Sequence, residues 1–323
     1  MRVLVTGGAG YIGSVIVARL VARGHQVTVY DDLSRGHAAA VHPAARLLRG
    51  DVRDAAAMRA ALAGSGADAV VHMAALAEVS ESVARPDLYH DVNANGSAAL
   101  ASAAAAAGVR GVVYSSTAAV YGEPRRTPIE EGDALAPSNP YGESKLAGER
   151  LLAAAGLPMV ALRYFNACGA DGGLGEDHRP ETHLVPLALR AAQTGGDVRV
   201  FGTDYPTPDG TCVRDYVHVA DLAEAHILAL ERLPDLTGAF NLGTGCGDSV
   251  LTVLDTVEAV TGLGLRRVMT ARRPGDPPAL VASNRRAAAE LGWRPRRSLA
   301  DAVRDAWEWL QAHPSGYGDG VGD

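Results

Sequence analysis

The chain has 323 residues, of which 21% are charged, and its formal net charge is −7. A negative charge argues against nucleic acid as the main partner, and no apolar run is long enough to span a membrane. The three cysteines, Cys168, Cys212 and Cys246, form no Cys-x-x-Cys pair, so we expect neither a disulfide framework nor a metal site. Because the chain opens directly with a predicted strand, we expect no signal peptide, and the cysteine usage favours a reducing cytoplasm.

Short β-rich runs alternate with alanine-rich amphipathic segments in the first half of the chain. The pattern predicts strands over residues 2–6, 26–30, 69–74, 111–115 and 159–164, and helices over residues 12–23 and 55–62. This alternation indicates an α/β fold, a Rossmann-type doubly wound parallel sheet covered by helices on both faces.

The alternation loosens after Asn166, where loop-like stretches rich in Gly, Asp and Pro begin. We therefore predict two domains. A Rossmann domain occupies residues 1–166, with segments near 213–243 returning to it, and a smaller mixed α/β substrate domain occupies most of residues 167–323. The glycine-rich tail, residues 316–323, is expected to be disordered.

A glycine-rich loop, Thr6 to Gly13, joins the first predicted strand to the first helix. Gly7 permits a tight turn, Gly10 lets the backbone approach a pyrophosphate, and Gly13 lets helix and strand pack closely. Asp31 ends the second strand, 18 residues after Gly13. A carboxylate there accepts a hydrogen bond from a ribose 2′-hydroxyl and repels a 2′-phosphate, which favours NAD over NADP. The alternative for Asp31 is a solvated turn.

Polar residues stand at the ends of two further strands. Asp51, in Gly50-Asp51-Val52, follows a third strand and is expected near the adenine amino group, with a helix cap as the alternative. Tyr114-Ser115-Ser116-Thr117 ends another strand, at the edge where ligands bind in an open parallel sheet. The Thr117 hydroxyl is therefore a candidate partner for a substrate hydroxyl, and the alternative is a helix or turn cap.

Lys145 is the only lysine in the chain, and it follows Tyr141 by four residues. On a helix this spacing places both side chains on one face, one turn apart. A phenol held beside an ammonium has a lowered pKa and becomes a candidate acid/base. Together with Thr117, the two residues form a set that moves a proton while a nicotinamide moves a hydride. The sequence thus predicts NAD-dependent oxidation of an alcohol.

With these residues the chain resembles the extended short-chain dehydrogenase/reductase family. Four downstream motifs narrow the resemblance to UDP-glucose (UDP-galactose) 4-epimerases: Arg163-Tyr164-Phe165-Asn166, Asp204 to Thr211, Arg214 to Ala223, and Asn241-Leu242-Gly243. The similarity runs from Arg2 to about His313. It implies reversible 4-epimerisation of UDP-galactose and UDP-glucose. In that reaction Tyr141 removes the sugar 4′-hydroxyl proton while tightly bound NAD takes the hydride from C4. The 4-keto sugar then turns, and the hydride returns to its opposite face.

The resemblance also implies roles for individual side chains. Thr117 and Tyr141 meet the sugar 4′-hydroxyl, and Lys145 bridges to the nicotinamide ribose. The implied cofactor site comprises Gly7, Gly10, Tyr11, Ile12, Gly13, Asp31, Asp51, Val52, Met73, Ala74, Asn93, Ser115, Tyr141, Lys145 and Tyr164. The implied UDP-sugar site comprises Thr117, Tyr141, Asn166, His183, Leu184, Phe201, Arg214, Tyr216, Arg273, Asp276 and Leu280.

Three positions depart from the commonest pattern of the family. Met73 stands where an aromatic residue is common, and Glu78 where a cation is often found, so Glu78 is expected to affect cofactor affinity. Leu280 occupies the position that limits the 2-substituent of the sugar, where strict glucose/galactose enzymes tend to carry tyrosine. The shorter side chain predicts that UDP-N-acetylhexosamines are also accepted.

Other functions on the same fold are the alternatives. A nucleotide-sugar 4,6-dehydratase typically needs an Asp-Glu pair after the threonine, where this chain has Ala118 and Ala119. A UDP-glucuronate 4-epimerase is a further alternative, although no carboxylate clamp is evident. A non-catalytic NAD-sensing binding module is disfavoured because the chain keeps Tyr141 and its sole lysine.

The family usually forms homodimers through helices of the larger domain, here near Asp87 to Ala107 and Tyr141 to Ala155. The alanine-rich faces of these helices permit close helix contact, and they suit a buried core equally well. The sequence leaves open the pathway served, whether galactose metabolism, a cell-surface polysaccharide or a specialised glycoside.

Overall fold

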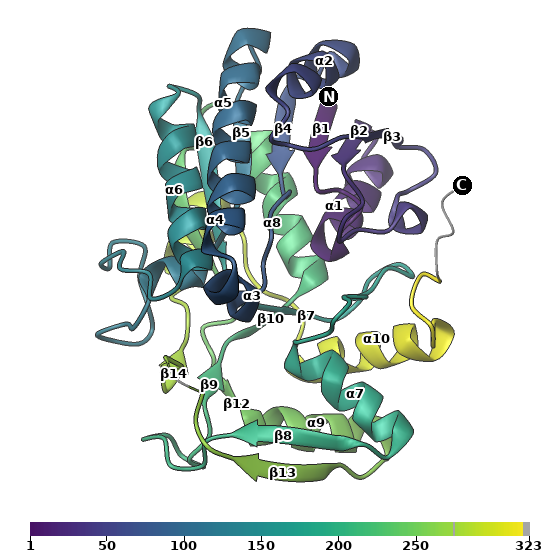
Figure 1. The fold of residues 1–323 in the computed structure, drawn as a ribbon, viewed down its shortest axis with the longest axis vertical. Helices are drawn as coiled ribbons and strands as arrows, with labels where there is room; N and C mark the ends of the chain where they lie inside the picture. Colours follow the sequence, from purple (N-terminus) through teal and green to yellow (C-terminus); the bar gives the residue numbers. More distant parts are fainter. Residues whose placement is uncertain (274, 319–323) are drawn as a thin grey trace.

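The structure is a computed structural model and describes residues 1–273 and 275–318. Its centre is a parallel sheet with the strand order β11-β6-β5-β4-β1-β2-β3 (Figure 1). The strands are β1 (Arg2–Thr6), β2 (Gln26–Asp31), β3 (Arg46–Arg49), β4 (Ala69–His72), β5 (Val112–Thr117), β6 (Met159–Tyr164) and β11 (Gly238–Leu242). The predicted fold class, a Rossmann-type parallel sheet, is confirmed.

Helices cover both faces of this sheet. Helices α1 (Tyr11–Ala22) and α8 (Val219–Arg232) lie on one face, and α2 (Ala55–Ser65), α5 (Gly96–Ala107) and α6 (Pro140–Ala154) on the other. In β1, Val3 and Val5 join the core beneath α1 and α8, whereas Leu4 joins the core beneath α2 and α5. A strand buried on both faces reads as a continuous apolar run, which is why this strand could be predicted.

Before α5 the chain forms two short helices, α3 (Val79–Ala84) and α4 (Pro86–Tyr89), and a π-helical segment over His90–Asn95. These helical segments lie against α6, at the carboxyl edge of the sheet. Among the helices that the structure describes, none combines the length and the apolarity that a membrane crossing requires.

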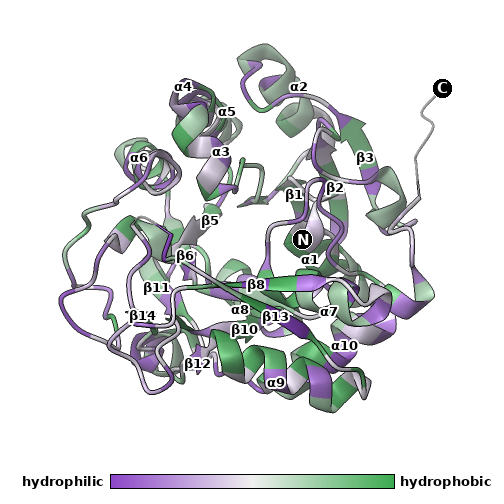
Figure 2. Cartoon of the chain, turned by 60° about the horizontal axis from the view of Figure 1, so that its bottom comes forward, coloured by the Kyte–Doolittle hydropathy of each residue, from purple (hydrophilic) through white to green (hydrophobic). Residues whose placement is uncertain are grey.

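The second half of the chain adds small sheets and three helices below the carboxyl edge of the central sheet (Figure 1). The strand pairs are β7 (Asn166–Cys168) with β10 (Tyr216–His218) and β8 (Asp197–Phe201) with β13 (Arg266–Thr270); β9 (Val213–Arg214) lies between β12 (Asp248–Ser249) and β14 (Ala279–Leu280). Helices α7 (Leu184–Thr194), α9 (Val250–Thr261) and α10 (Leu299–Ala312) enclose a separate apolar core. Figure 2 shows hydrophobic and hydrophilic residues alternating along α9, as in a helix with one buried face.

The C-terminal tail is partly ordered, contrary to the prediction. The Tyr317 amide donates to Asp177 Oδ2 at 3.0 Å, and the Tyr317 hydroxyl donates to the Gly175 carbonyl at 3.2 Å. The Tyr317 ring also packs against His37, with 5.1 Å between ring centroids. The prediction of disorder is wrong for residues 316–318, because one aromatic ring anchors a glycine-rich segment. The remaining tail, residues 319–323, lies outside the described residues.

Candidate active site

A cleft of about 2030 Å³ lies at the carboxyl edge of the central sheet and is lined by residues from both halves of the chain. A pocket for one small ligand usually measures roughly 300–1,000 Å³, so this cleft has room for two nucleotide-sized ligands. It gathers all of the residues predicted for the cofactor and substrate sites except Asn93.

Asn93 is buried behind the wall of the cleft, with 1% of its surface exposed. Its side-chain amide donates to the Leu76 carbonyl at 3.0 Å and to Ser144 Oγ at 2.9 Å. Its Oδ1 atom accepts from the Leu76 amide at 2.8 Å. Asn93 therefore fixes the loop after β4 against α6 in this structure instead of lining the cleft.

The glycine loop has the shape that a diphosphate requires. Gly7 adopts a φ of +70°, and a Cβ atom there would lie 2.5 Å from the Ala74 amide nitrogen. A Cβ atom on Gly13 would lie 2.1 Å from the Gly7 carbonyl oxygen. A Cβ atom on Gly10 would meet only that same oxygen, at 3.5 Å, so the Gly10 backbone stays open to an approaching ligand. The N-terminus of α1 follows directly and favours an anion.

The acidic residues after β2 and β3 have different surroundings. Asp31 is 7% exposed, and its carboxylate accepts from the Ala9 amide at 3.0 Å and the Leu33 amide at 2.9 Å. The solvated-turn alternative for Asp31 is therefore wrong. Burial raises the pKa of Asp31, and its backbone hydrogen bonds oppose that effect. Asp51 lines the cleft beside Arg53, whose side-chain hydrogen bond lowers the pKa of Asp51. The cap of α2 is Asp54, whose side chain accepts from two backbone amides of the helix.

Tyr141 and Lys145 lie in the first two turns of α6. Asn139 caps this helix by accepting a hydrogen bond from the Gly142 amide at 2.9 Å, and Pro140 occupies its first position. Thr117 ends β5, and its Oγ1 atom accepts from the Ala119 amide at 3.1 Å. The Thr117 side chain also lies close enough to the Tyr141 phenol to lower its pKa. Thr117 thus caps the turn after β5 and also lies beside Tyr141, the candidate acid/base.

The pKa of the Tyr141 phenol differs from the prediction. Burial raises the pKa of Tyr141, and the Thr117 side chain only partly opposes the rise. The lowered pKa expected for Tyr141 is therefore not found in this structure, because burial of the phenol itself dominates. Lys145 is also buried, with 2% of its surface exposed, and burial lowers the pKa of Lys145 to about 7 despite the charge of Glu149. Desolvation disfavours the charged form of both groups.

A buried polar network lies directly behind Lys145. Glu149 follows Lys145 by one helical turn and forms an ion pair of 2.7 Å with Arg163. Ser116 also donates to Glu149, and Arg163 donates to the Tyr121 hydroxyl at 2.9 Å. Sequence reasoning used Arg163 only as part of a motif and missed Glu149, although its spacing from Lys145 is a usable signal.

The opposite side of the cleft carries two fixed guanidinium groups. Arg214 donates to the Pro277 carbonyl at 2.9 Å and to Asp276 at 3.3 Å. The Arg273 guanidinium lies 3.8 Å from the centroid of the Phe201 ring, in the geometry of a cation–π contact. Held side chains of this kind suit the bidentate recognition of a diphosphate.

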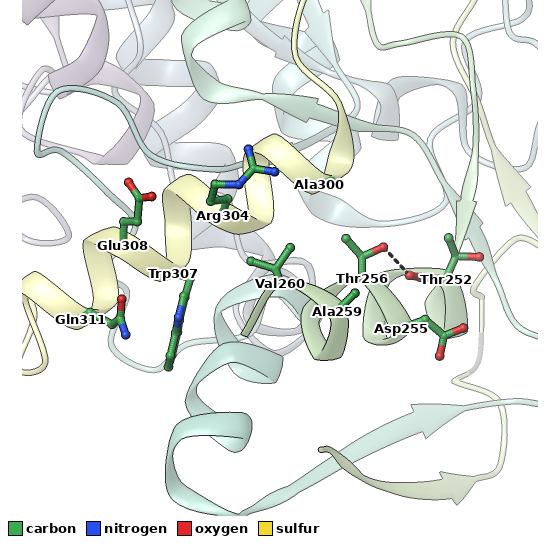
Figure 3. Close-up of a pocket in the computed structure, with 10 residues that line it drawn as sticks. All are labelled: Thr252, Asp255, Thr256, Ala259, Val260, Ala300, Arg304, Trp307, Glu308 and Gln311. Atoms are coloured by element: carbon green, nitrogen blue, oxygen red, sulfur yellow. Dashed lines mark hydrogen bonds between the residues drawn. The ribbon is translucent and has the colours of Figure 1, made fainter. Parts of the chain in front are cut away.

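Sequence reasoning missed several residues that line the cleft, among them Glu176, His178 and Tyr317. The density of Glu and His over residues 176–183 was the available signal. A separate hollow of about 760 Å³ lies between α9 and α10 (Figure 3). None of the predicted site residues lines it, so the chemistry belongs to the cleft.

Comparison with known proteins identifies relatives along the whole chain. Residues 3–243 match the model of the NAD dependent epimerase/dehydratase family. A UDP-glucose 4-epimerase of Lacticaseibacillus casei is 48% identical, over 99% of this chain and 99% of that protein. The structure of a UDP-glucose 4-epimerase from Brucella ovis in complex with NAD superposes with a TM-score of 0.91, at 46% identity, covering 95% of this chain and 97% of that one. The epimerase from Bifidobacterium longum in complex with NAD+ and UDP has a TM-score of 0.93 at 36% identity, covering 98% of this chain and all of that one (100%).

Proposed function

The chain belongs to the NAD dependent epimerase/dehydratase family, and we propose that it catalyses the reversible 4-epimerisation of UDP-galactose and UDP-glucose with NAD as its bound cofactor. One observation carries the proposal. Thr117, Tyr141 and Lys145 line the same cleft as the open glycine loop and the two arginines, Arg214 and Arg273, that suit a diphosphate.

The residues present fit NAD. The open backbone at Gly10 admits a pyrophosphate, and the buried Asp31 carboxylate suits a ribose hydroxyl. NAD, when bound, supplies the hydride acceptor and the positive nicotinamide charge that the buried phenol otherwise lacks. The relatives from Brucella ovis and Bifidobacterium longum, whose structures contain NAD or NAD+, support this assignment.

The side chains of the protein then transfer the proton and orient the sugar. Tyr141 removes the proton of the 4′-hydroxyl, and Thr117 orients that hydroxyl by hydrogen bonding. Lys145 stabilises the phenolate that forms. Arg214 and Arg273 hold the diphosphate while the oxidised sugar turns within the cleft, and Tyr141 finally returns the proton.

Product analysis of the purified protein tests the proposal. Given UDP-galactose without added NAD, the protein is expected to form UDP-glucose until the two reach equilibrium. The Tyr141→Phe variant should retain NAD and form product at least about a hundredfold more slowly, which separates catalysis from mere cofactor binding. Absence of product from the unaltered protein, both with and without added NAD, would reject the proposed reaction.

A second substrate class is supported by Leu280. This side chain lines the cleft from β14, and the family resemblance implies that its position limits the sugar 2-substituent. We propose that UDP-N-acetylglucosamine is also a substrate, in line with a relative from Campylobacter jejuni described as a UDP-Glc/GlcNAc 4-epimerase, 33% identical to this chain. No turnover of UDP-N-acetylglucosamine under conditions that turn over UDP-galactose would exclude it. Activity on UDP-glucuronate is measured in the same assay.

The assembly and compartment are further parts of the proposal. We propose a homodimer through α5 and α6, where Leu151 is 38% exposed, and light scattering of the purified protein tests it. We also propose that the protein works in galactose metabolism in the cytoplasm. The three unpaired cysteines, of which Cys168 and Cys212 are buried, support a reducing compartment.

A further inference from the structure

A compact cluster of histidine and glutamate side chains lines the cleft between the glycine loop and α7. Its members are Glu176, His178, Glu181 and His183, and one polar atom of each lies within 4.8 Å of those of the others. Tyr11 of the glycine loop packs against it, with 6.3 Å between the Tyr11 and His178 ring centroids. The cluster therefore lies next to the place where a diphosphate would bind.

Glu176 is the centre of the cluster. It is 7% exposed, and its Oε1 atom lies 3.1 Å from Nδ1 of His178 and forms a hydrogen bond with Nδ1 of His183. No hydrogen bond to Nε2 of either ring is found within residues 1–273 and 275–318. The histidine side chains keep 30% and 49% of their surface exposed in the cleft. The buried carboxylate thus fixes the inner nitrogen of each ring and leaves the outer nitrogen to a ligand.

We propose that Glu176 holds His183, with His178 beside it, as an imidazolium whose Nε2–H donates to the diphosphate of a bound nucleotide. Glu176 acts through the histidines and is a positioning residue. The inference rests on the proposed function, because that function identifies the ligand. It goes beyond the proposed function by stating that Glu176 keeps His183 positively charged.

The charge balance around His183 supports a cation there. The groups that face it are Glu176, Glu181 at 3.8 Å, Glu78 and His178. The charge of Glu176 is the largest influence and raises the pKa of His183 to about 9, against the opposing effect of burial. Although burial favours its neutral form, Glu176 remains ionised, because His183 and His178 lower its pKa to about 2. At neutral pH the cluster therefore presents a donor, and not a lone pair, to the cleft.

The raised pKa of His183 predicts how UDP binding should change with pH. The imidazolium is present below about pH 9 and is lost as the pH rises through that value. A hydrogen bond to a charged group contributes about 1.5–3 kcal/mol, so its loss should weaken UDP binding roughly tenfold or more. Uridine has no phosphate but carries the same uracil ring, which itself loses a proton near the top of this pH range. The fall in UDP affinity should therefore exceed any fall in uridine affinity.

Calorimetric titration of the holoenzyme with UDP and with uridine between pH 7.5 and pH 10 tests the inference. In the unaltered protein UDP affinity should fall with rising pH. The Glu176→Gln variant keeps an acceptor but lacks the charge, so its UDP affinity should already be low at pH 7.5 and stay flat. The UDP affinity of the His183→Gln variant should also not change with pH. Glu308→Gln replaces an exposed carboxylate on α10 that does not line the cleft. It removes the same charge and should follow the unaltered protein.

Two measurements identify which diphosphate is bound. If His183→Gln or His178→Gln loses UDP affinity at unchanged NAD content, the imidazolium serves the substrate. If NAD content falls instead, it serves the cofactor. UDP affinity and NAD content that are both independent of pH in the unaltered protein, or a Glu176→Gln variant that follows the unaltered protein in both, would overturn the inference. So would UDP binding that EDTA abolishes, since the cluster would then hold a metal ion. Direct binding keeps this test separate from the product analysis with UDP-galactose.

Discussion

Replacement of the single lysine should stabilise the protein while abolishing turnover. The pKa of Lys145 falls from 10.5 in an exposed chain to about 7 in the folded protein, because the side chain is buried. A base with a lowered folded pKa binds fewer protons when folded, so its charge costs stability below the unfolded pKa. The difference is about 3.5 pKa units, and because the pH of 7 lies at the folded pKa, the cost at this pH is about 4 kcal/mol.

The Lys145→Met variant removes this cost but also loses a contact. The Lys145 ammonium lies 4.5 Å from the centroid of the Tyr114 ring, and a desolvated cation–π contact contributes about 2 kcal/mol. Methionine has a similar length and leaves Glu149 paired with Arg163. The expected net gain is therefore about 2 kcal/mol at pH 7. At roughly 2.1 cal/mol/K of unfolding entropy per residue, this gain raises the melting temperature by about 3 °C.

Thermal unfolding of both proteins, each freed of NAD, measures the difference. Removing NAD matters because a ligand that binds only the folded state adds stability of its own. The gain should shrink as the pH rises from 7 toward 10.5, where the unfolded lysine also loses its proton. Lys145→Arg is the matched control, because an arginine stays charged when buried and should give no gain. A Lys145→Met variant less stable than the unaltered protein at pH 7, or a gain that does not change with pH, would refute the reasoning.

Three further substitutions test other parts of the site. Gly13→Ala should lose NAD, because its Cβ atom would lie 2.1 Å from the Gly7 carbonyl oxygen; absorbance of the denatured protein extract measures the cofactor content. Tyr141→Phe should keep NAD and lower turnover at least about a hundredfold, the usual contribution of a general acid/base, in the UDP-galactose assay. Arg163→Met should lower the unfolding free energy by about 3–5 kcal/mol in urea denaturation, because it leaves the Glu149 carboxylate buried without its partner. A loss under 1 kcal/mol would contradict that account.

The features of the site that follow local rules could be predicted from the sequence. The β1 strand is a continuous apolar run, and the glycines at positions 7 and 13 are required by short backbone contacts. Tyr141 and Lys145 share a helix face because their spacing fits one helical turn. Each of these inferences needs only the geometry of one or two neighbouring elements, which the sequence itself specifies.

The features that depend on burial could not be predicted in the same way. The resemblance that implied a place for Asn93 in the cofactor site contains no information on depth, and the structure buries this residue against α6. The tail composition indicated disorder, yet Tyr317 docks on the loop near Glu176. Tyr141 and Lys145 both line the cleft, but the burial of each group decides the direction in which its pKa shifts. Distances along the chain predict proximity, and they do not predict the local dielectric environment.

Because Tyr141 and Lys145 are both buried, their ionisation should depend on whether a ligand occupies the cleft. With its pKa raised by burial, Tyr141 holds its proton at neutral pH, and Lys145, with a pKa of about 7, is charged in only about half of the molecules. A positive charge brought into the cleft beside Tyr141 lowers the free energy of the phenolate, and the phenolate in turn favours the charged form of Lys145. Proton removal is therefore coupled to occupancy of the cleft. A base that was already ionised in the open cleft would bind solvent protons and counterions instead, so the cost of burying Lys145 is consistent with a site that becomes reactive only when filled.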